Sequence, residues 1–534
     1  MCRVDPDAPG TLQRAMLAEI YDANPNIVTA LGSLTVLCLL TSLLKPADKP
    51  AAKTTRTATA VAPAGFASFQ RSYLLTYGVV LLADWLQGTH FHALYSEHGM
   101  TDEQTGTLFL TGFLSSALFG TYIGVLVDSI GRRRGCAIYC VLEVIINTLE
   151  HSRSFEVLWI GRILGGVSTS LLGCSFESWM VTKHKASGFP DALLEQTFAR
   201  ASFINGLLAV LAGIIAHFLD VSFGMGPIGP FQAAIALTIV ALLLVLGWEE
   251  NYGEAAESNN GTGAGAGGNG AAAGKRASKK NGHANGASAA KAGATADSGV
   301  LAALIEAAKL MRRDPRLWML GVMQACFEGG MFAWVSIWVP ALMALKAPAD
   351  NLPCGLVFSC FMLCISTGAN IYSAVQARLG IGTTTSIALV LAVCSMLLPL
   401  LVPYPPSFHL VMTVFCLFEV TVGALNPALA VMRAKIIPTR VQSTMMTAYR
   451  LPLNALVVLG THLGSSYGWT AVCRLNAIGF SVALTLHLIG SLSQPTAAAA
   501  PMKAKPAKSP AKSPAKSPAR ARASPARTRK LKAD

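Results

Sequence analysis

Charged side chains are scarce in this chain of 534 residues: Asp, Glu, Lys and Arg make up 13% of it, and hydrophobic residues make up 52%. Its mean hydropathy is +0.49. Soluble domains carry about 25% charged residues. The shortage of charge excludes the row of soluble domains that this length would otherwise suggest.

The sequence also lacks the usual signatures of chemistry. Its 12 cysteines form no CxxC pair, so neither a metal-binding nor a redox motif is indicated. We find no metal-ligand cluster, phosphate-binding loop or nucleophile motif. We therefore expect no catalytic residue, no metal and no cofactor, and an enzyme is disfavoured.

Apolar runs near 20 residues are abundant instead, and that length spans a hydrocarbon core of about 30 Å. The fold class that they predict is an all-α integral membrane protein with twelve transmembrane helices in two six-helix halves. The predicted spans are 73–95, 104–127, 135–150, 156–180, 197–219, 228–248, 316–345, 354–377, 383–402, 407–432, 442–465 and 469–490.

Polar segments divide the chain. An N-terminal part, 1–70, holds an extra hydrophobic helix at 26–44 and a basic linker. The first half is 71–252 and the second is 312–492. The Gly/Ala/Asn-rich stretch 253–311 between them has the composition of a disordered linker, and 493–534 that of a disordered basic tail.

The distribution of basic residues predicts the orientation. Most of the 42 lysines and arginines fall on one side if the loop with Arg132 and Arg133 is cytoplasmic. The C-terminus is then cytoplasmic as well. Repeated Lys-Ser-Pro-Ala in the tail favours contact with anionic lipids, and we expect no nucleic acid partner.

The stretch GVLVDSIGRRR, from Gly124 to Arg134, stands between the second and third spans. It resembles the signature loop of the major facilitator superfamily, G-x-x-x-D-[RK]-x-G-R-[RK], with Ser129 in place of the usual basic residue. A carboxylate beside a tight glycine turn and arginines makes a breakable latch. Candidate gate residues are Asp128, Gly131, Arg132, Arg133 and Glu177.

A narrower resemblance covers most of 69–252 and 312–490. The segments ADWLQGTHFHALY, GRILGGVSTSLL, TFARASFIN and WEENYG are similar to the eukaryotic molybdate-anion transporter branch of the superfamily. The resemblance implies uptake of the molybdate anion at the plasma membrane by alternating access.

Ionisable residues inside membrane spans are costly and point to function. Asp84 and Gln87 lie on one helical stripe, and Glu328 has a comparable position in the second half. Candidate coupling or charge-pair residues are Asp84, Glu328, Glu143 and Glu419. Because four acids would repel a dianion, either some bind protons with the substrate, as in proton coupling, or they pair with arginines when the site is empty.

A tetrahedral dianion needs positive charge and hydrogen-bond donors, and arginine suits such oxygens. The candidate substrate-binding residues are Arg162, Arg450, Thr169, Ser168, Asn205, Asn454 and Gln87. A buried acid–arginine pair that only sets helix register is the structural alternative.

The sequence thus predicts a secondary transporter that imports molybdate across the bilayer. Two alternatives stay open: a major facilitator carrier for another solute, such as a sugar, a nucleoside or another oxyanion, and a non-transporting membrane receptor or scaffold.

Overall fold

The computed structural model describes residues 24–43, 63–252, 305, 308–346, 352–437 and 442–492, and within these ranges the regular structure is helical. The predicted basic tail, 493–534, and nearly all of the predicted linker, 253–311, lie outside the described residues. The prediction of an all-α protein is confirmed.

The helices of the N-terminal part are α2 (Pro25–Ser42), α3 (Phe66–Gly88), α4 (Phe91–Glu97), α5 (Asp102–Ile130), α6 (Arg132–Leu149), α7 (Phe155–Ala186), α8 (Asp191–His217), the π-helix η1 (Phe218–Ser222) and α9 (Gly229–Leu246). Those of the C-terminal part are α12 (Pro315–Val335), α13 (Trp338–Met343), α14 (Cys354–Leu401), α15 (Phe408–Ile436), α16 (Gln442–Tyr467) and α17 (Trp469–Leu492).

Local sequence explains several helix ends. Thr101 and Gln104 form a reciprocal capping box at the start of α5. The Ser407 side chain accepts a hydrogen bond from the Leu410 amide at the start of α15. The polypeptide leaves α5 through Gly131, whose φ of 109° is suited to glycine.

Helices occupy all of the predicted spans. In the described part of the chain, seven helical segments are long and apolar enough to cross a membrane by length and composition. They are α2, α7, α8 with η1, α9, α14, α15 and α17. The total of twelve crossings stays a prediction.

Two predicted spans, 354–377 and 383–402, both fall within α14. Gly380 interrupts this helix with φ 78° and ψ 163°, which are not helical angles. The chain therefore bends at Gly380, between the two predicted spans.

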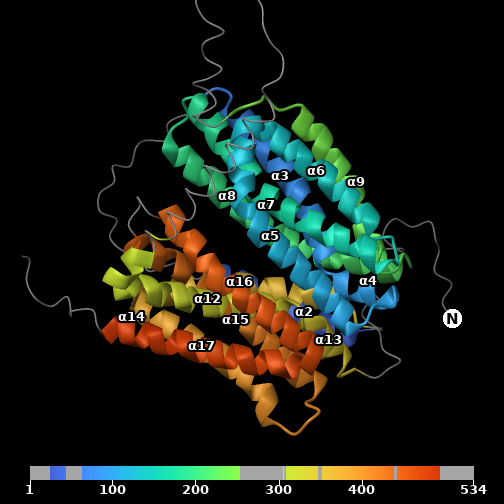
Figure 1. Ribbon diagram of the computed structural model, residues 1–534, viewed down its shortest axis with the longest axis vertical. Coiled ribbons are helices and arrows are strands. Elements are labelled where there is room, and N and C mark those ends of the chain that lie inside the picture. The colour runs from blue at the N-terminus through green and yellow to red at the C-terminus, as the bar shows by residue number, and fades with distance from the viewer. Residues whose placement is uncertain are drawn as a thin grey trace, which may run out of the picture. The chain divides into compact units, whose positions relative to one another are not determined.

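Packing groups the helices into two sets, shown in blue to green and in yellow to red in Figure 1. In the first set, α3 packs against α8 and α9, and α7 packs against α5 and α6. In the second set, α14 packs against α15 and α17, and α12 against α16 and α17. The two sets meet where α8 packs on α14 and where α5 packs on α16.

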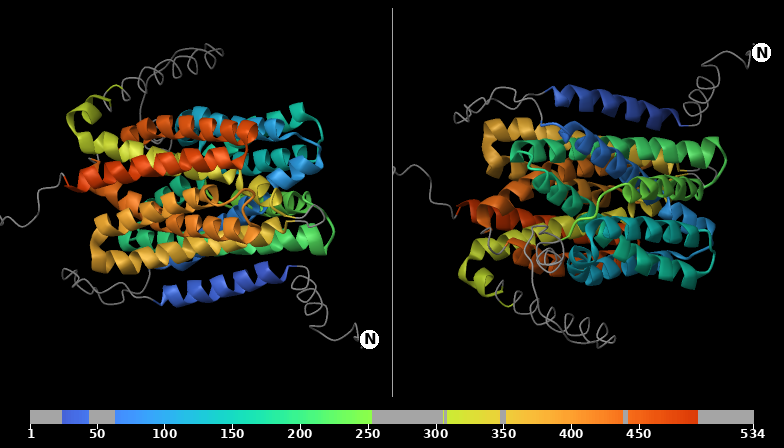
Figure 2. Two further views of the ribbon diagram at one scale, coloured as in Figure 1. Left: turned by 90° about the horizontal axis from the view of Figure 1, so that it is seen from below. Right: turned by 90° about the horizontal axis from the view of Figure 1, so that it is seen from above.

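The extra N-terminal helix is present as α2, close to the predicted 26–44. It packs on α14, and Figure 2 shows it at the edge of the bundle. The Asn370 side-chain amide lies 3.4 Å from the Cys38 carbonyl oxygen and from Thr41 Oγ1. Exposed leucines such as Leu39 and Leu43 cover much of its remaining surface, as expected of a helix in lipid.

Small residues bring the backbones of α14 and α15 into close contact. A Cβ atom added to Gly423 would lie 1.9 Å from the Ile365 carbonyl oxygen, and one added to Gly368 would lie 2.0 Å from that of Val420. Such crossings are typical of membrane helices, whose association depends on close packing.

We expect Gly423→Ala to destabilise the protein, because the added methyl group collides with backbone that cannot rotate away. Overpacking of this kind costs about 1–3 kcal/mol. Thermal denaturation of the purified protein measures the effect. Gly382→Ala is the matched control, because a Cβ atom there has no neighbour within 4 Å. Equal stability of the two variants would contradict the close crossing.

Candidate functional site

Glu143 lies at the centre of a buried polar cluster between α3, α6 and α7. Its carboxylate accepts hydrogen bonds from Gln87 Nε2 at 2.9 Å, from Ser168 Oγ at 2.6 Å and from Asn147 Nδ2 at 3.2 Å. Glu143 is 6% exposed and Ser168 is fully buried. The cluster thus satisfies a buried acid with neutral donors, and it brings together three of the residues predicted from sequence.

Arg162 pairs with an acid that the sequence analysis did not single out. Its Nη2 atom lies 2.8 Å from Glu150 Oε1, at the end of α6. The Tyr95 hydroxyl donates to the same oxygen at 3.2 Å. The guanidinium carbon also lies 3.8 Å from the centre of the Phe91 ring, within cation–π range. Arg162 is therefore fixed by an ion pair and an aromatic face.

The second set of helices contains its own internal ion pair. Arg433 Nη1, on α15, lies 3.3 Å from Glu328 Oε1, on α12. Both side chains are 21% exposed. Gln324 Nε2 donates to the other Glu328 oxygen at 3.1 Å. Glu328 was predicted to be a coupling or pairing residue, and Arg433 is the partner that the sequence did not identify.

Glu419 lies in the apolar interior of the second set and is 3% exposed. Its Oε2 atom is buried without a hydrogen-bond partner among the described residues. A buried carboxylate without donors is costly. Glu419 therefore differs from Glu143, whose oxygens are all engaged.

One face of α7 carries small and polar residues toward open space. Thr169, Gly173 and Glu177 follow one another at intervals of four residues, and all three are exposed. A Cβ atom added to Gly165 or to Gly173 would meet no atom within 4 Å. Many exposed residues of the neighbouring α5 and α6 are large and apolar, such as Leu118, Leu126 and Ile138. The face with Thr169, Gly173 and Glu177, here called the α7 polar face, is unsuited to hydrocarbon.

Asp84 lies on α3, in the first set of helices. Its side chain is half-buried, and no hydrogen bond or ion pair joins it to another described residue. Tyr77 lies two turns before Asp84 on the same stripe of α3. The Glu143 carboxyl also interacts electrostatically with Asp84. Asp84 is therefore an acid without a hydrogen-bond or ion-pair partner among the described residues, and Tyr77 lies within electrostatic range of both Asp84 and Glu177.

Arg450 supplies a positive charge from the other set of helices. Its side chain is exposed on α16, and among the described residues it has neither an ion pair nor a hydrogen bond. A Cβ atom added to Gly120 on α5 would lie 3.9 Å from Arg450 Nη1 and 3.4 Å from Ser170 Oγ. Arg450 thus reaches α5 of the first set of helices, where Ser170 of α7 approaches the same glycine.

Two asparagines were predicted to be neutral donors. Asn454 lies one turn after Arg450 on α16 and is half-buried, without a hydrogen bond to another described residue. Asn205 on α8 is partly engaged, since its Oδ1 atom accepts a hydrogen bond from Trp85 Nε1 at 2.9 Å. Its amide NH₂ group is not used in that bond.

The predicted gate loop is held by the segment that follows α9. Asp128 pairs with Arg132 at 2.8 Å. The Glu250 carboxylate accepts from the Arg133 amide at 2.8 Å, and a Cβ atom on Gly131 would lie 2.5 Å from the Glu250 carboxyl carbon. Because residue 131 has no side chain, the Glu250 carboxylate can approach the N-terminus of α6. The N-terminal end of a helix favours negative charge.

The residues around Glu250 extend this contact to α7. The rings of Trp179 and Trp248 stack with centres 3.8 Å apart, and Trp179 Nε1 donates to the Glu249 carbonyl at 2.8 Å. Lys183 hydrogen-bonds to the Glu249 carboxylate and lowers the pKa of that exposed group. The conspicuous WEENYG segment therefore ties α6, α7 and α9 together.

The apolar helices, their buried polar groups and the α7 polar face define a multi-pass membrane protein. A profile of a family described as sugar transporters with 12 TM segments matches residues 37–264 and 287–420. The chain is 32% identical over 413 residues to a protein of Takifugu rubripes named molybdate-anion transporter, covering 75% of this chain and 80% of that one. A protein of the same name in Danio rerio is 29% identical over 440 residues, 81% of this chain and 87% of its own.

The chain therefore belongs to the major facilitator superfamily, in the family that contains these molybdate-anion transporters, and it is a membrane transporter. Solved structures agree on the fold. The nucleoside transporter NupG matches with a TM-score of 0.56 at 10% identity, over 79% of this chain and 98% of that one. A peptide transporter of the POT family in complex with sulfate matches with a TM-score of 0.57 at 14% identity, over 80% and 94%.

Removing one member of the Arg162–Glu150 pair leaves the other charge buried, which costs about 3–5 kcal/mol. We therefore expect Glu150→Gln and Arg162→Met each to lower thermal stability. The double variant should recover most of the loss, because Met still packs on Phe91 and Gln still accepts from Tyr95. Thermal denaturation of all four proteins measures this coupling. Additive losses in the double variant would show that the pair does not hold these helices together.

Proposed function

We propose that the protein imports molybdate across the plasma membrane by alternating access, with its C-terminus in the cytoplasm. The relatives named molybdate-anion transporter support this substrate. The observation that carries the proposal is the exposed Arg450, a cation without a partner among the described residues, which reaches from α16 to Gly120 of α5 in the other set of helices.

Arg450 is the arginine that we assign to the anion. Its guanidinium has all its donors available to tetrahedral oxygens. Asn454, one turn after Arg450 on α16, is the neutral donor that we assign beside it, and Asn205 is a further donor. Thr169 donates to the Gly165 carbonyl oxygen at 2.9 Å, so its hydroxyl would have to leave that bond to donate to the anion. Arg162 is less suited to bind the anion, because its Nη2 atom is paired with Glu150 and its guanidinium lies on the Phe91 ring.

Gln87 and Ser168 then act indirectly. Both donate to Glu143, so their hydrogen-bonding groups are directed into the contact between α3, α6 and α7. We assign them to positioning α3 and α7, the helices that carry Asp84 and the α7 polar face. Glu328 has a similar role in the second set through Arg433.

Substitution of Arg450 tests this assignment. In cells that lack molybdate uptake, Arg450→Gln should reduce uptake at low molybdate about 10- to 100-fold, since hydrogen bonds to charged groups contribute about 1.5–3 kcal/mol. Intracellular molybdenum is the measurement, at equal amounts of protein in the plasma membrane. Arg474→Gln is the matched control, because Arg474 is exposed on α17 among apolar residues.

Normal uptake by Arg450→Gln would remove Arg450 from the site. No uptake by the wild type at nanomolar supply would reject molybdate as the substrate.

The family description as sugar transporters supports a second candidate, a sugar carrier. Competition by excess sugar and by sulfate separates a carbohydrate site from a general oxyanion site.

Two acids are suited to carry protons. Asp84 on α3 has no hydrogen-bond or ion-pair partner among the described residues, and Glu419 is buried without a donor to Oε2. Loading Asp84 with a proton would lower the negative charge that an entering dianion meets. We assign Asp84 as the main coupling residue and Glu419 as a second acid.

Asp84→Asn should uncouple uptake from the proton gradient. Wild-type uptake is expected to rise as external pH falls, because import then proceeds with protons. The variant should lose this dependence and still exchange labelled for unlabelled molybdate. Uptake at several external pH values, with exchange in parallel, measures both. Wild-type dependence on pH in Asp84→Asn would contradict the assignment.

Alternating access requires that the two sets of helices separate at one end and meet at the other. At the end with α4 and α13, Gly213 of α8 and Gly355 of α14 approach closely: a Cβ atom on Gly355 would lie 2.2 Å from the Gly213 carbonyl oxygen. At the same end a Cβ atom on Gly106 would lie 2.7 Å from Ser465 Cβ. We assign this end to the outside and this arrangement to the closed outer gate.

The opposite end carries the Asp128–Arg132 pair and Glu250. In this arrangement both partners of each contact belong to the first set of helices. We propose that the loop at Gly131 moves as a rigid body with α6, α7 and α9. Glu177 is exposed at the same end of α7, and we assign it to the inner opening. Asp128 is 50% exposed and keeps the capacity to change partners.

A further inference from the structure

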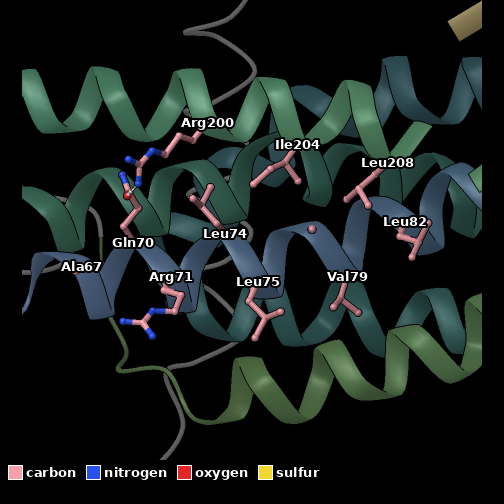
Figure 3. Close-up of a pocket in the computed structure, with 11 residues that line it drawn as sticks. Ala67, Gln70, Arg71, Leu74, Leu75, Val79, Leu82, Arg200, Ile204 and Leu208 are labelled. Atoms are coloured by element: carbon pink, nitrogen blue, oxygen red, sulfur yellow. Dashed lines mark hydrogen bonds between the residues drawn. The ribbon is translucent and has the colours of Figure 1, made fainter. Parts of the chain in front are cut away.

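A groove of about 570 Å³ runs along the surface between α3 and α8 (Figure 3). Its walls are apolar over most of their length: Leu75, Val79 and Leu82 come from α3, and Ile204 and Leu208 come from α8. Leu75 is 59% exposed. In a membrane-spanning protein, an open apolar wall of this kind is in contact with lipid chains.

Two arginines border one end of the groove. Figure 3 shows the guanidinium groups of Arg71 and Arg200 at the end near Ala67. Gln70 positions Arg200: its Oε1 atom accepts from Arg200, and its Nε2 atom donates to Thr197 Oγ1 at 2.8 Å. Arg71 is exposed and has no ion pair with another described residue.

The groove thus combines a short cationic end with a long apolar body. Arg71 and Leu82 are eleven residues apart on one helix, so the groove extends about 16 Å from the cation. An anion alone would use the arginines and leave the apolar walls uncovered. A neutral lipid would cover the walls and leave the two positive charges uncompensated. A ligand with an anionic head and an acyl chain matches both parts.

We propose that the α3–α8 groove binds one anionic phospholipid, with its phosphate at Arg71 and Arg200 and an acyl chain along Leu75, Val79 and Ile204. The charge of the arginines selects the headgroup, as at other basic sites beside membrane helices. The lipid would bridge α3, which carries Asp84, and α8, which packs on α14 of the other set. The proposal is independent of the transported solute.

The test uses the full-length protein, purified in a neutral detergent and depleted of lipid. Phosphatidylglycerol, phosphatidylcholine and inorganic phosphate are added separately. Native mass spectrometry counts bound lipid, and thermal denaturation follows stabilisation. We expect phosphatidylglycerol to bind about tenfold more tightly than phosphatidylcholine, and inorganic phosphate to have no effect.

Three variants locate the lipid. Arg71→Gln/Arg200→Gln should lose the preference for phosphatidylglycerol. Arg312→Gln/Arg313→Gln is the matched control, because it removes two exposed arginines outside the groove. Val79→Phe fills the groove and keeps both charges, and it should also lose bound phosphatidylglycerol. Lipid-free denaturation profiles of all variants verify folding.

The other outcomes overturn the proposal. Equal binding of phosphatidylcholine would show only general lipid contact. Stabilisation by inorganic phosphate would show a site for a free anion. Unchanged binding in Val79→Phe would place the lipid elsewhere, and a loss in the Arg312/Arg313 control equal to that in the groove variant would show a response to net charge alone.

Discussion

The cost of an uncompensated charge in a low-dielectric environment governs the interior of this protein. The chain meets this cost in different ways. Glu143 is surrounded by three neutral donors, and Arg162 is paired with Glu150 against an aromatic ring. Glu328 is paired with Arg433. These groups are compensated within one set of helices, so they stabilise that set without contacting a solute.

The groups without such compensation are the ones available to a solute. Asp84 and Arg450 have no partner among the described residues, and they come from α3 and α16 of different sets. On α7, Gly165 and Gly173 have open space before them. We propose that the anion enters this space. An anion bound there would compensate Arg450 and link the two sets. Substrate binding and the relative movement of the helix sets would then depend on the same charge.

Hydropathy was sufficient to place the helices, including the extra N-terminal one, because the length of an apolar run is a local property. It also identified Glu143 and Gln87 as polar residues inside spans. It did not predict that they contact each other, because this depends on which faces of α3 and α6 meet. Glu150 and Arg433 were missed for a related reason. Both lie near predicted span ends, where charged residues usually face water, and only helix packing directs them to Arg162 and Glu328. The one sequence signal for the Glu150–Arg162 pair was their short separation across the connection between α6 and α7.

Equilibrium binding of molybdate to the purified protein tests most directly whether the unpaired arginine, rather than the paired one, holds the anion. Saturable binding is expected for the wild type and for the double variant Arg162→Met/Glu150→Gln, which removes the internal pair. Arg450→Gln should abolish it. Binding that survives in Arg450→Gln and disappears in the Arg162/Glu150 variant would reverse the assignment and contradict the account.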